Sequence, residues 1–359
     1  MSKAAELAAL IGSQTATSNR NFIINGGMRV AQRGTSTASI TGSGVFVIDR
    51  WELDEVADST LTMSQETLTT GAAFDAGLNH SLKVLVTTAD TSIGSSQAVQ
   101  LMQSIEAQNL QTLKFGSSGA RNLTLSFYYK SNVTGVHTVC IDKIDSTRTT
   151  CPLEFTVSSA NTWERHTLKA VANSAVQGSS GAIANDNGAG FRVIWGLAYG
   201  SDYQSGTSGT WEQNGTASFS TSNQQNIVGA ADNYIELTGV QLEIGDVATP
   251  FEHEDVGTTL ANCQRYYYQA GGDAANSFAY KGYLLASTYV AATHQHPVTM
   301  RAAPTMTKVG TFAGTSINQP SAVQATTVTY VWQAQKDGSN GSYNFYSNSS
   351  GGFTLDAEL

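Results

Sequence analysis

Charged side chains are scarce in this chain. They make up 13% of its 359 residues, about half of the roughly 25% found in typical soluble domains. Aspartate and glutamate outnumber lysine and arginine by 28 to 19, which gives a net charge of −9. Binding to DNA or RNA needs clustered basic side chains that neutralise phosphates. Because the sequence holds no such cluster, we predict that the protein has no nucleic-acid partner.

Long apolar runs and paired cysteines are also missing. No stretch reaches the roughly 18 apolar residues that a membrane-spanning helix requires, so we expect no membrane insertion. The first residues, M-S-K-A-A-E-L-A-A-L-I-G, hold too short an apolar run for a secretion signal. Cys140, Cys151 and Cys263 are an odd number, which argues against a disulfide framework. We expect reduced core thiols and synthesis in a reducing cytoplasm, with a Cys140–Cys151 pair across a hairpin as the alternative.

The familiar catalytic motifs do not occur. The chain contains no G-x-S-x-G elbow, no phosphate-binding G-x-x-x-x-G-K-[ST] loop and no H-E-x-x-H pair. The acidic group F-E-H-E-D at 251–255 suits a solvated helix cap better than a metal or acid–base site. Spacing alone identifies no pair of glycosidase carboxylates among 28 acids. We therefore predict that the protein is not an enzyme and uses no cofactor.

Glycine and aromatic residues are abundant, and they occur in short β-patterned runs. The chain has 34 glycines, 14 tyrosines, 13 phenylalanines and 5 tryptophans. In 191–199, large residues alternate with others, as in a strand with one buried face. Runs of this kind fall at 45–54, 60–68, 81–88, 97–106, 121–130, 135–144, 164–171, 190–199 and 234–243. Many short strands without intervening helices predict an all-β protein built on a jelly-roll β-sandwich.

Four segments follow from this pattern. Residues 1–20 form a short N-terminal helix and linker, with Ala4, Leu7, Ala8 and Ile11 on one face of the helix. So short a helix does not persist alone in water. Its apolar face is therefore predicted to bind symmetry copies or another protein, or else to pack on its own domain.

The other three segments make up the rest of the chain. Residues 21–255 form the jelly roll, and 256–270 form a short helical connector that Asp255 caps. Residues 271–359 form a second, smaller C-terminal β domain. Its predicted strands lie at 279–291, 296–300, 305–312, 325–334 and 342–346.

Aromatic residues near one polar loop suggest a sugar site. Tyr199, Tyr203 and Trp211 flank or lie in the segment Q-S-G-T-S-G-T-W-E-Q-N at 204–214. Sugar rings stack their C–H faces on aromatic rings, and amide side chains bind their hydroxyl groups. The candidate glycan-binding residues are Tyr199, Tyr203, Trp211 and Asn214. Packing in the core remains the alternative for each ring.

Two histidines define the weaker candidate for a metal site. His294 and His296 share one face if 291–298 is a strand. Around a threefold axis, three copies of this pair would offer six nitrogens to one metal ion. Two exposed or hydrogen-bonded imidazoles beside Pro297 are the favoured interpretation, so no metal site is predicted.

Two stretches of sequence resemble a known family. They are N-F-I-I-N-G-G-M-R-V-A-Q-R-G at 21–34 with V-I-D-R-W at 47–51, and T-G-V-Q-L-E-I-G-D-V-A-T-P-F-E-H at 238–253 followed by L-A-N-C-Q-R-Y-Y-Y at 260–268. They resemble the opening and closing segments of the carbohydrate-binding-module-like jelly roll found in phage tail fibres and other tail proteins. The resemblance covers about residues 20–270, and its ends are the specific part.

The resemblance implies a homotrimeric structural component of a bacteriophage tail, a tail fibre or adhesin. Such a protein is made in the host bacterial cytoplasm, resides in the virion, docks on other tail proteins through its N-terminus and contacts host surface polysaccharide. It also implies a possible structural Ca²⁺ at Glu243. The main alternative is an architectural virion protein, such as a tail adaptor, collar or capsid decoration, without a receptor role. A depolymerase is the third interpretation, and the least favoured.

Three local structural features are expected at the residues that match this family. Asn25, Gly26 and Gly27 suit a turn that needs positive φ angles. Asp49 or Arg50 is expected to pair beside Trp51. In V-Q-L-E-I-G, Val240, Leu242 and Ile244 are expected to face the core while Gln241 and Glu243 face outward.

Overall fold

The structure, a computed structural model, describes residues 20–271, 277–338, 340–348 and 351–359. The chain divides into two compact units, Met1–Glu254 and Asp255–Leu359. In both units the described strands pair antiparallel into sheets, so the all-β prediction is confirmed. The predicted helix that carries Ala4, Leu7, Ala8 and Ile11 lies outside the described residues.

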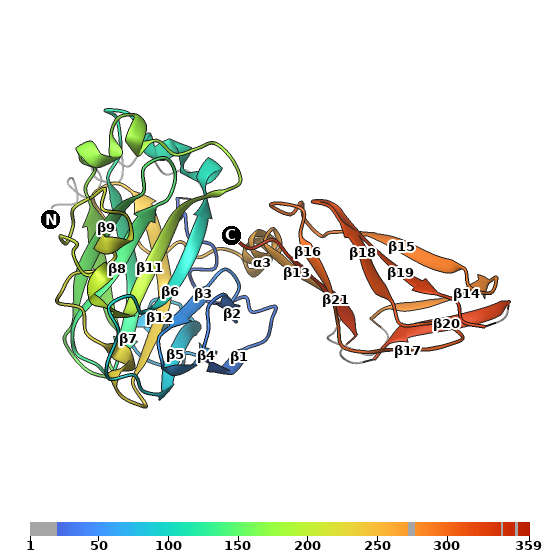
Figure 1. The fold of residues 1–359 in the computed structure, drawn as a ribbon. Helices are drawn as coiled ribbons and strands as arrows, with labels where there is room; N and C mark the ends of the chain where they lie inside the picture. The colour runs from blue at the N-terminus through green and yellow to red at the C-terminus, as the bar shows by residue number, and fades with distance from the viewer. Residues whose placement is uncertain (1–19, 272–276, 339, 349–350) are drawn as a thin grey trace. The chain divides into compact units, whose positions relative to one another are not determined.

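The N-terminal unit is a sandwich of two six-stranded antiparallel sheets, which Figure 1 shows face to face. Sheet A has the order β1 (Ser36–Ile40), β4 (Thr60–Thr67), β5 (His80–Thr88), β12 (Tyr234–Ile244), β7 (Leu123–Ser131) and β10 (Glu164–Ala170). Sheet B has the order β2 (Val45–Phe46), β3 (Glu52–Val56), β6 (Ala98–Glu106), β11 (Ala189–Tyr199), β8 (Gly135–Lys143) and β9 (Thr149–Val157). Neighbouring strands are mostly distant in sequence, as in a jelly roll.

Helices are short and few among the described residues. The N-terminal unit contains α2 (Ala72–Asp75) and the 3₁₀ turns η1 (Ala107–Leu113), η2 (Ser174–Val176), η3 (Ser179–Gly181), η4 (Ser201–Tyr203), η5 (Gly215–Ser218) and η6 (Ile227–Gly229). The C-terminal unit begins with α3 (Val256–Gln264), and Asp255 caps it by accepting a hydrogen bond from the Gly257 N–H. In the part of the chain that the structure describes, no helix combines the length and apolar character needed to cross a membrane.

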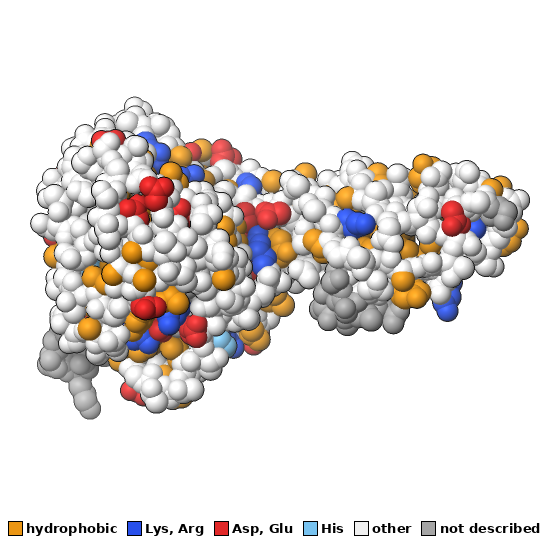
Figure 2. Space-filling model, turned by 60° about the horizontal axis from the view of Figure 1, so that its bottom comes forward, with side chains coloured by type: hydrophobic (Ala, Val, Ile, Leu, Met, Phe, Trp, Pro, Cys, Tyr) orange, Lys and Arg blue, Asp and Glu red, His pale blue; other side chains and the backbone are white. Residues whose placement is uncertain are grey.

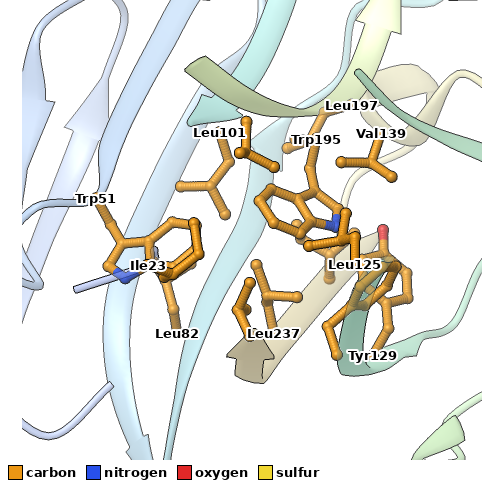
Figure 3. Packing of buried hydrophobic residues seen from close by; sticks show 14 of the residues in the cluster. Ile23, Trp51, Leu82, Leu101, Leu125, Tyr129, Val139, Trp195, Leu197 and Leu237 are labelled. Atoms are coloured by element: carbon orange, nitrogen blue, oxygen red, sulfur yellow. The ribbon is translucent and has the colours of Figure 1, made fainter. Parts of the chain in front are cut away.

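The main core fills the space between the two sheets, and aromatic rings lie at its centre. Trp51 and Trp195 are fully buried with ring centroids 5.6 Å apart, and Phe127 meets Trp195 edge-on at 5.5 Å. Figure 3 shows these tryptophans among leucines from both sheets. This packing explains why large residues alternate along β11 from Phe191 to Leu197, since every second side chain there enters the core. A register shift between Gly196 and Ala198 then places Tyr199 in an apolar cluster on the outer face of sheet B.

The two segments that open the jelly roll pack against each other around Asn25. Its Nδ2 donates to the carbonyls of Val30 and Asp49, at 2.9 and 3.1 Å, and its own carbonyl accepts from Trp51 Nε1 at 3.3 Å. Asp49 lies 3.7 Å from Arg33, and Arg50 donates to the carbonyl of Ser104 at 2.6 Å. The motif residues therefore form one hydrogen-bonded corner of the sandwich.

The predicted reason for the two glycines after Asn25 is wrong. Positive φ occurs at Asn25 and Met28, at 58° and 57°, and at neither glycine. Gly26 instead lies against β12: its carbonyl accepts from the Val240 N–H at 3.0 Å, and a Cβ at Gly26 would come 2.2 Å from the Val240 carbonyl oxygen. Close approach of two backbones, rather than turn geometry, requires this glycine.

The closing strand β12 follows its predicted alternation with one difference. Val240 and Leu242 enter the core, and Ile244 packs at its margin. Gln241 and Glu243 face the other way but are also buried, with 0% and 3% exposure. The segment after the strand covers them, because Thr249 donates to the Glu243 carboxylate from its N–H and its hydroxyl, both at 2.8 Å.

The C-terminal unit consists of three three-stranded antiparallel sheets. Their orders are β13 (Tyr267–Gly271), β21 (Gly352–Asp356), β16 (Thr305–Val309); β14 (Ala279–Leu284), β20 (Gly341–Ser347), β17 (Phe312–Thr315); and β15 (Tyr289–Gln295), β19 (Thr329–Gln335), β18 (Ser321–Ala325). Inward-facing aromatic residues such as Trp332, Phe345 and Phe353 form its core. The predicted single strand at 279–291 is two strands, and 296–300 lies outside any strand.

All three cysteines are buried and free in this structure. Cys140 and Cys151 lie on the paired strands β8 and β9, but their register partners are Pro152 and Ile141. Cys151 enters the main core, whereas Cys140 joins a separate apolar cluster on the outer face of sheet B. The two thiols therefore project from opposite faces of the sheet.

Buried His137 makes the stability of the N-terminal unit depend on pH. Its two ring nitrogens lie 3.0 Å from the Tyr129 hydroxyl and 3.0 Å from the Val133 carbonyl, and burial lowers its pKa from 6.5 to about 4. The unfolded chain binds the proton first, so stability is full above pH 6.5 and falls between pH 6.5 and about 4. The expected slope from His137 is about 1.4 kcal/mol per pH unit.

Urea unfolding at several pH values in this window checks the expectation. His137→Gln should show a shallower slope than the wild-type chain, because it removes one titrating group. Burial also lowers the pKa of His80 and His166, so part of the slope should remain. Equal slopes in the two proteins would contradict this assignment.

Candidate functional site

Of the four candidate glycan-binding residues, the structure brings Tyr199 and Tyr203 into ring contact, with centroids 5.8 Å apart, and places Trp211 in a different cluster. Trp211 is 2% exposed and packs in the main core against Phe115 and Phe191, with ring centroids 5.5 and 6.1 Å away. Tyr199 is 4% exposed, and its hydroxyl donates to Gln100. A buried ring offers no face to a sugar, so both rings are packing residues in this structure.

Tyr203 and Asn214 are more accessible, and each contacts different residues. The Tyr203 ring is half-buried and stacks on Phe219 at 6.1 Å, and its hydroxyl donates to the Ser96 carbonyl. Asn214 is exposed and donates to Glu212 at 3.1 Å. Tyr199 and Tyr203 are covered because a second apolar cluster, which includes Met102 and Ile194, lies on the outer face of sheet B. The segment after β11 packs over this cluster.

The residues considered for metal binding are engaged in hydrogen bonds. His294 Nε2 lies 2.6 Å from the Tyr280 hydroxyl and accepts from Trp332 Nε1 at 3.1 Å. His296 Nε2 lies 2.9 Å from the Thr326 carbonyl. Glu243 accepts from Thr249 and Gln241. No group of three or more His, Cys, Asp or Glu side chains within the described ranges is arranged to hold a metal ion.

A different aromatic group lies on the outer face of sheet A, and we call it the Trp163 platform. Its members are the half-buried rings of Trp163 and Tyr234 together with the polar side chains of Lys83, Lys130, Asn161 and Glu236. Strand β12 carries Tyr234 and Glu236 and lies between β5 with Lys83 and β7 with Lys130 (Figure 1). Glu236 is the register partner of both lysines, so all three side chains leave the sheet on one face.

The ammonium group of Lys130, on strand β7, contacts both rings of the platform. Its Nζ lies 5.1 Å from the ring centre of Trp163 and 5.8 Å from that of Tyr234, within the range of cation–π attraction. The same Nζ forms an ion pair with Glu236 at 2.8 Å. Lys83 Nζ lies 4.8 Å from the Tyr234 ring centre. Burial, with the nearby Glu236 charge, raises the Tyr234 pKa, so its hydroxyl stays protonated.

The loop that carries Trp163 is held in place from both sides. Glu164 accepts hydrogen bonds from the Ser158 and Ser159 N–H groups, the latter at 2.8 Å. Asn161 has a left-handed φ of 59°, its N–H donates to the Ser131 carbonyl at 2.7 Å, and its Oδ1 accepts from the Tyr234 hydroxyl at 2.6 Å. The platform is therefore pre-organised, which lowers the entropic cost of binding a ligand.

Trp163 differs from the other tryptophans in its exposure. Trp51, Trp195, Trp211 and Trp332 are at most 2% exposed, whereas Trp163 is half-buried. Few charged side chains are scattered over the face of the molecule that Figure 2 shows, which agrees with the low share of charged residues in the sequence. The platform could not be predicted from the sequence, because Lys130, Trp163 and Tyr234 come from three separate segments. Only the order of the strands in the sheet brings these segments together.

The platform has the chemistry of a saccharide site. Aromatic rings supply apolar area to the C–H face of a sugar. An ammonium group donates to the hydroxyl groups of a sugar, and an amide both donates to them and accepts from them. Ligand sites commonly combine an apolar surface with a few such placed polar groups.

Comparison with known proteins gives likenesses of structure alone. No family model matches the chain, and no curated protein matches its sequence. The enzymatically active domain of tailspike protein 4 from bacteriophage CBA120 is 12% identical with a TM-score of 0.32, over 63% of this chain and 22% of that one. A family 11 carbohydrate-binding module of a cellulosomal cellulase from Clostridium thermocellum is 12% identical with a TM-score of 0.29, over 62% and 99%.

A third similar structure is the carbohydrate-binding module TmCBM61 in complex with β-1,4-galactotriose. It is 12% identical with a TM-score of 0.28, and the match covers 63% of this chain and all of that one. The present chain thus spans about a fifth of the tailspike chain and nearly the full length of both modules.

Proposed function

We propose that this protein is a non-enzymatic tail fibre or adhesin of a bacteriophage and that the Trp163 platform binds polysaccharide on the host surface. The observation that carries the sugar-binding part is the half-buried Trp163 ring, fixed beside Tyr234 and polar groups on an outer sheet face. No cofactor takes part, so chelation of metal ions with EDTA should leave binding unchanged.

The tail assignment rests on the two sequence segments that resemble phage tail proteins. Their residues meet in the fold: the Phe22 N–H donates to the Leu242 carbonyl at 2.9 Å, and Trp51 donates to Asn25. A motif that closes the sandwich in this way supports a shared domain type. The tail role further implies a homotrimer in the virion that docks on neighbouring tail proteins through its first 20 residues.

One observation favours the alternative, an architectural virion protein without a receptor role. Lysine ammonium groups already lie against the rings of Trp163 and Tyr234. If those contacts only stabilise the sheet, the platform has no ligand. A glycan array probed with the full-length chain, together with adsorption of the protein to host cells, separates the two functions.

We expect a saturable signal on the glycan array and loss of adsorption after the cells are treated with periodate. Light scattering should show that the protein is a trimer. A monomer without any glycan signal would overturn it. Particle images that place the chain in the capsid shell would favour the architectural role. Release of reducing ends from the host polysaccharide would instead reveal a depolymerase.

A further inference from the structure

The C-terminal unit contains a pocket separate from the Trp163 platform. Its volume is about 370 Å³, and its principal lining residues are Tyr268, Ser277, Phe278, Tyr280, His294 and Tyr330. This volume lies near the lower end of the range of about 300–1,000 Å³ found for small-molecule sites. It suits one or two small rings rather than a long chain.

The described lining of the pocket is aromatic and carries no fixed charge. None of its described lining residues is Asp, Glu, Lys or Arg. Burial lowers the pKa of His294, so its imidazole is neutral near pH 7. A charged ligand would find no counter-charge among these described residues, and desolvation of that charge would cost free energy. The described part of the lining therefore favours neutral ligands.

Hydrogen bonds determine which nitrogen of His294 carries the proton. An indole N–H only donates, so Nε2 must accept the 3.1 Å bond from Trp332. The Tyr280 hydroxyl, 2.6 Å from the same nitrogen, must then donate to it. In the neutral ring the proton is consequently on Nδ1. The pocket wall thus presents a donor at His294 and lone pairs on the Tyr280 oxygen.

Tyr330 supplies a further polar group. Its ring lies between two imidazoles, stacked on His294 at 5.1 Å and on His296 at 5.6 Å, which fixes its orientation. Neither its hydroxyl nor His294 Nδ1 has a hydrogen-bond partner among the described residues. Both groups belong to residues that line the pocket. Rings and spaced neutral donors and acceptors match the C–H faces and hydroxyl groups of a sugar.

We infer that this pocket is a second carbohydrate site, which takes a neutral mono- or disaccharide unit and binds its hydroxyl groups through His294, Tyr280 and Tyr330. The site does not depend on the Trp163 platform. If the proposed function is correct, this site gives the chain a second contact with sugar, on a different unit from the platform.

The test is titration of the full-length chain with glucose, galactose, mannose, N-acetylglucosamine, lactose and maltose, by saturation-transfer NMR and calorimetry. At least one sugar should bind saturably in the millimolar range. Tyr330→Phe keeps the stacked ring and removes the hydroxyl, so it should weaken binding about tenfold. His294→Gln should weaken it at least as much, and Trp163→Ala should leave it unchanged.

Tyr283→Phe is the matched control, because Tyr283 lies in the same unit and is 67% exposed. It should bind like the wild-type chain. Absence of saturable binding for all six sugars would overturn the inference. So would binding that survives both Tyr330→Phe and His294→Gln, or binding that Trp163→Ala abolishes, which would place the sugar on the platform instead.

Discussion

Replacement of Gly26 by alanine is expected to destabilise the N-terminal unit by about 3 kcal/mol, at the upper end of the usual cost of overpacking. The new Cβ would lie 2.2 Å from the Val240 carbonyl oxygen. That oxygen belongs to the central strand β12 and accepts from Asn21 Nδ2 at 3.0 Å, so it has little freedom to move. The opening segment would have to separate from β12.

Gly27→Ala provides the matched control, because the next residue along the chain has room. A Cβ at Gly27 meets nothing closer than 3.7 Å. Its φ is not in the left-handed region, so alanine should change the free energy of unfolding by less than about 1 kcal/mol. Chemical denaturation of both variants measures the difference. Equal losses in the two would show that conformational freedom, and not close packing, maintains this pair of glycines.

Trp163→Ala is expected to weaken binding to host polysaccharide about thirtyfold, the effect of a loss of about 2 kcal/mol at an aromatic hot spot. The substitution removes the largest apolar area of the platform and leaves Lys130 with Glu236 as its ion-pair partner. Because the ring is half-buried, the fold should survive, and a thermal unfolding scan verifies this.

Tyr203→Ala separates the two aromatic surfaces of the jelly roll. Tyr203 is also half-buried but lies on the outer face of sheet B. Its loss should change the dissociation constant less than twofold. If Tyr203→Ala abolished binding and Trp163→Ala did not, the site predicted from the sequence would hold the sugar and the platform would be structural.

The sequence predicts the architecture well because each strand of a β-sandwich shows a local alternation of apolar and other residues. The alternation of Phe191, Val193, Trp195 and Leu197 follows directly from the pleat of β11. In short or irregular strands this alternation is weaker. Strand β9 was missed, and its run T-T-C-P-L-E-F-T-V holds a proline that usually indicates an edge, which is its place in sheet B.

The proposed glycan-binding surface is harder to predict because it depends on which strands become neighbours. Trp211 lies in a polar stretch of sequence, yet it fills the core beside Phe115. Trp163 lies in an equally polar stretch and stays accessible. Both tryptophans lie in a polar T-W-E segment, and the path of the loops decides which of them is buried. Likewise, the requirement at Gly26 comes from Val240, more than 200 residues later, and no turn rule detects it.

The most direct test of glycan binding at the platform uses the fluorescence of Trp163, since the other four tryptophans are buried. Acrylamide quenching would be measured on the full-length chain with and without the polysaccharide that gives the strongest glycan-array signal, and Trp163→Phe would supply the background. Stacking of a sugar on the ring predicts that the accessible component of quenching disappears when polysaccharide binds. Unchanged quenching of Trp163 in a chain that demonstrably binds the polysaccharide would contradict the proposal.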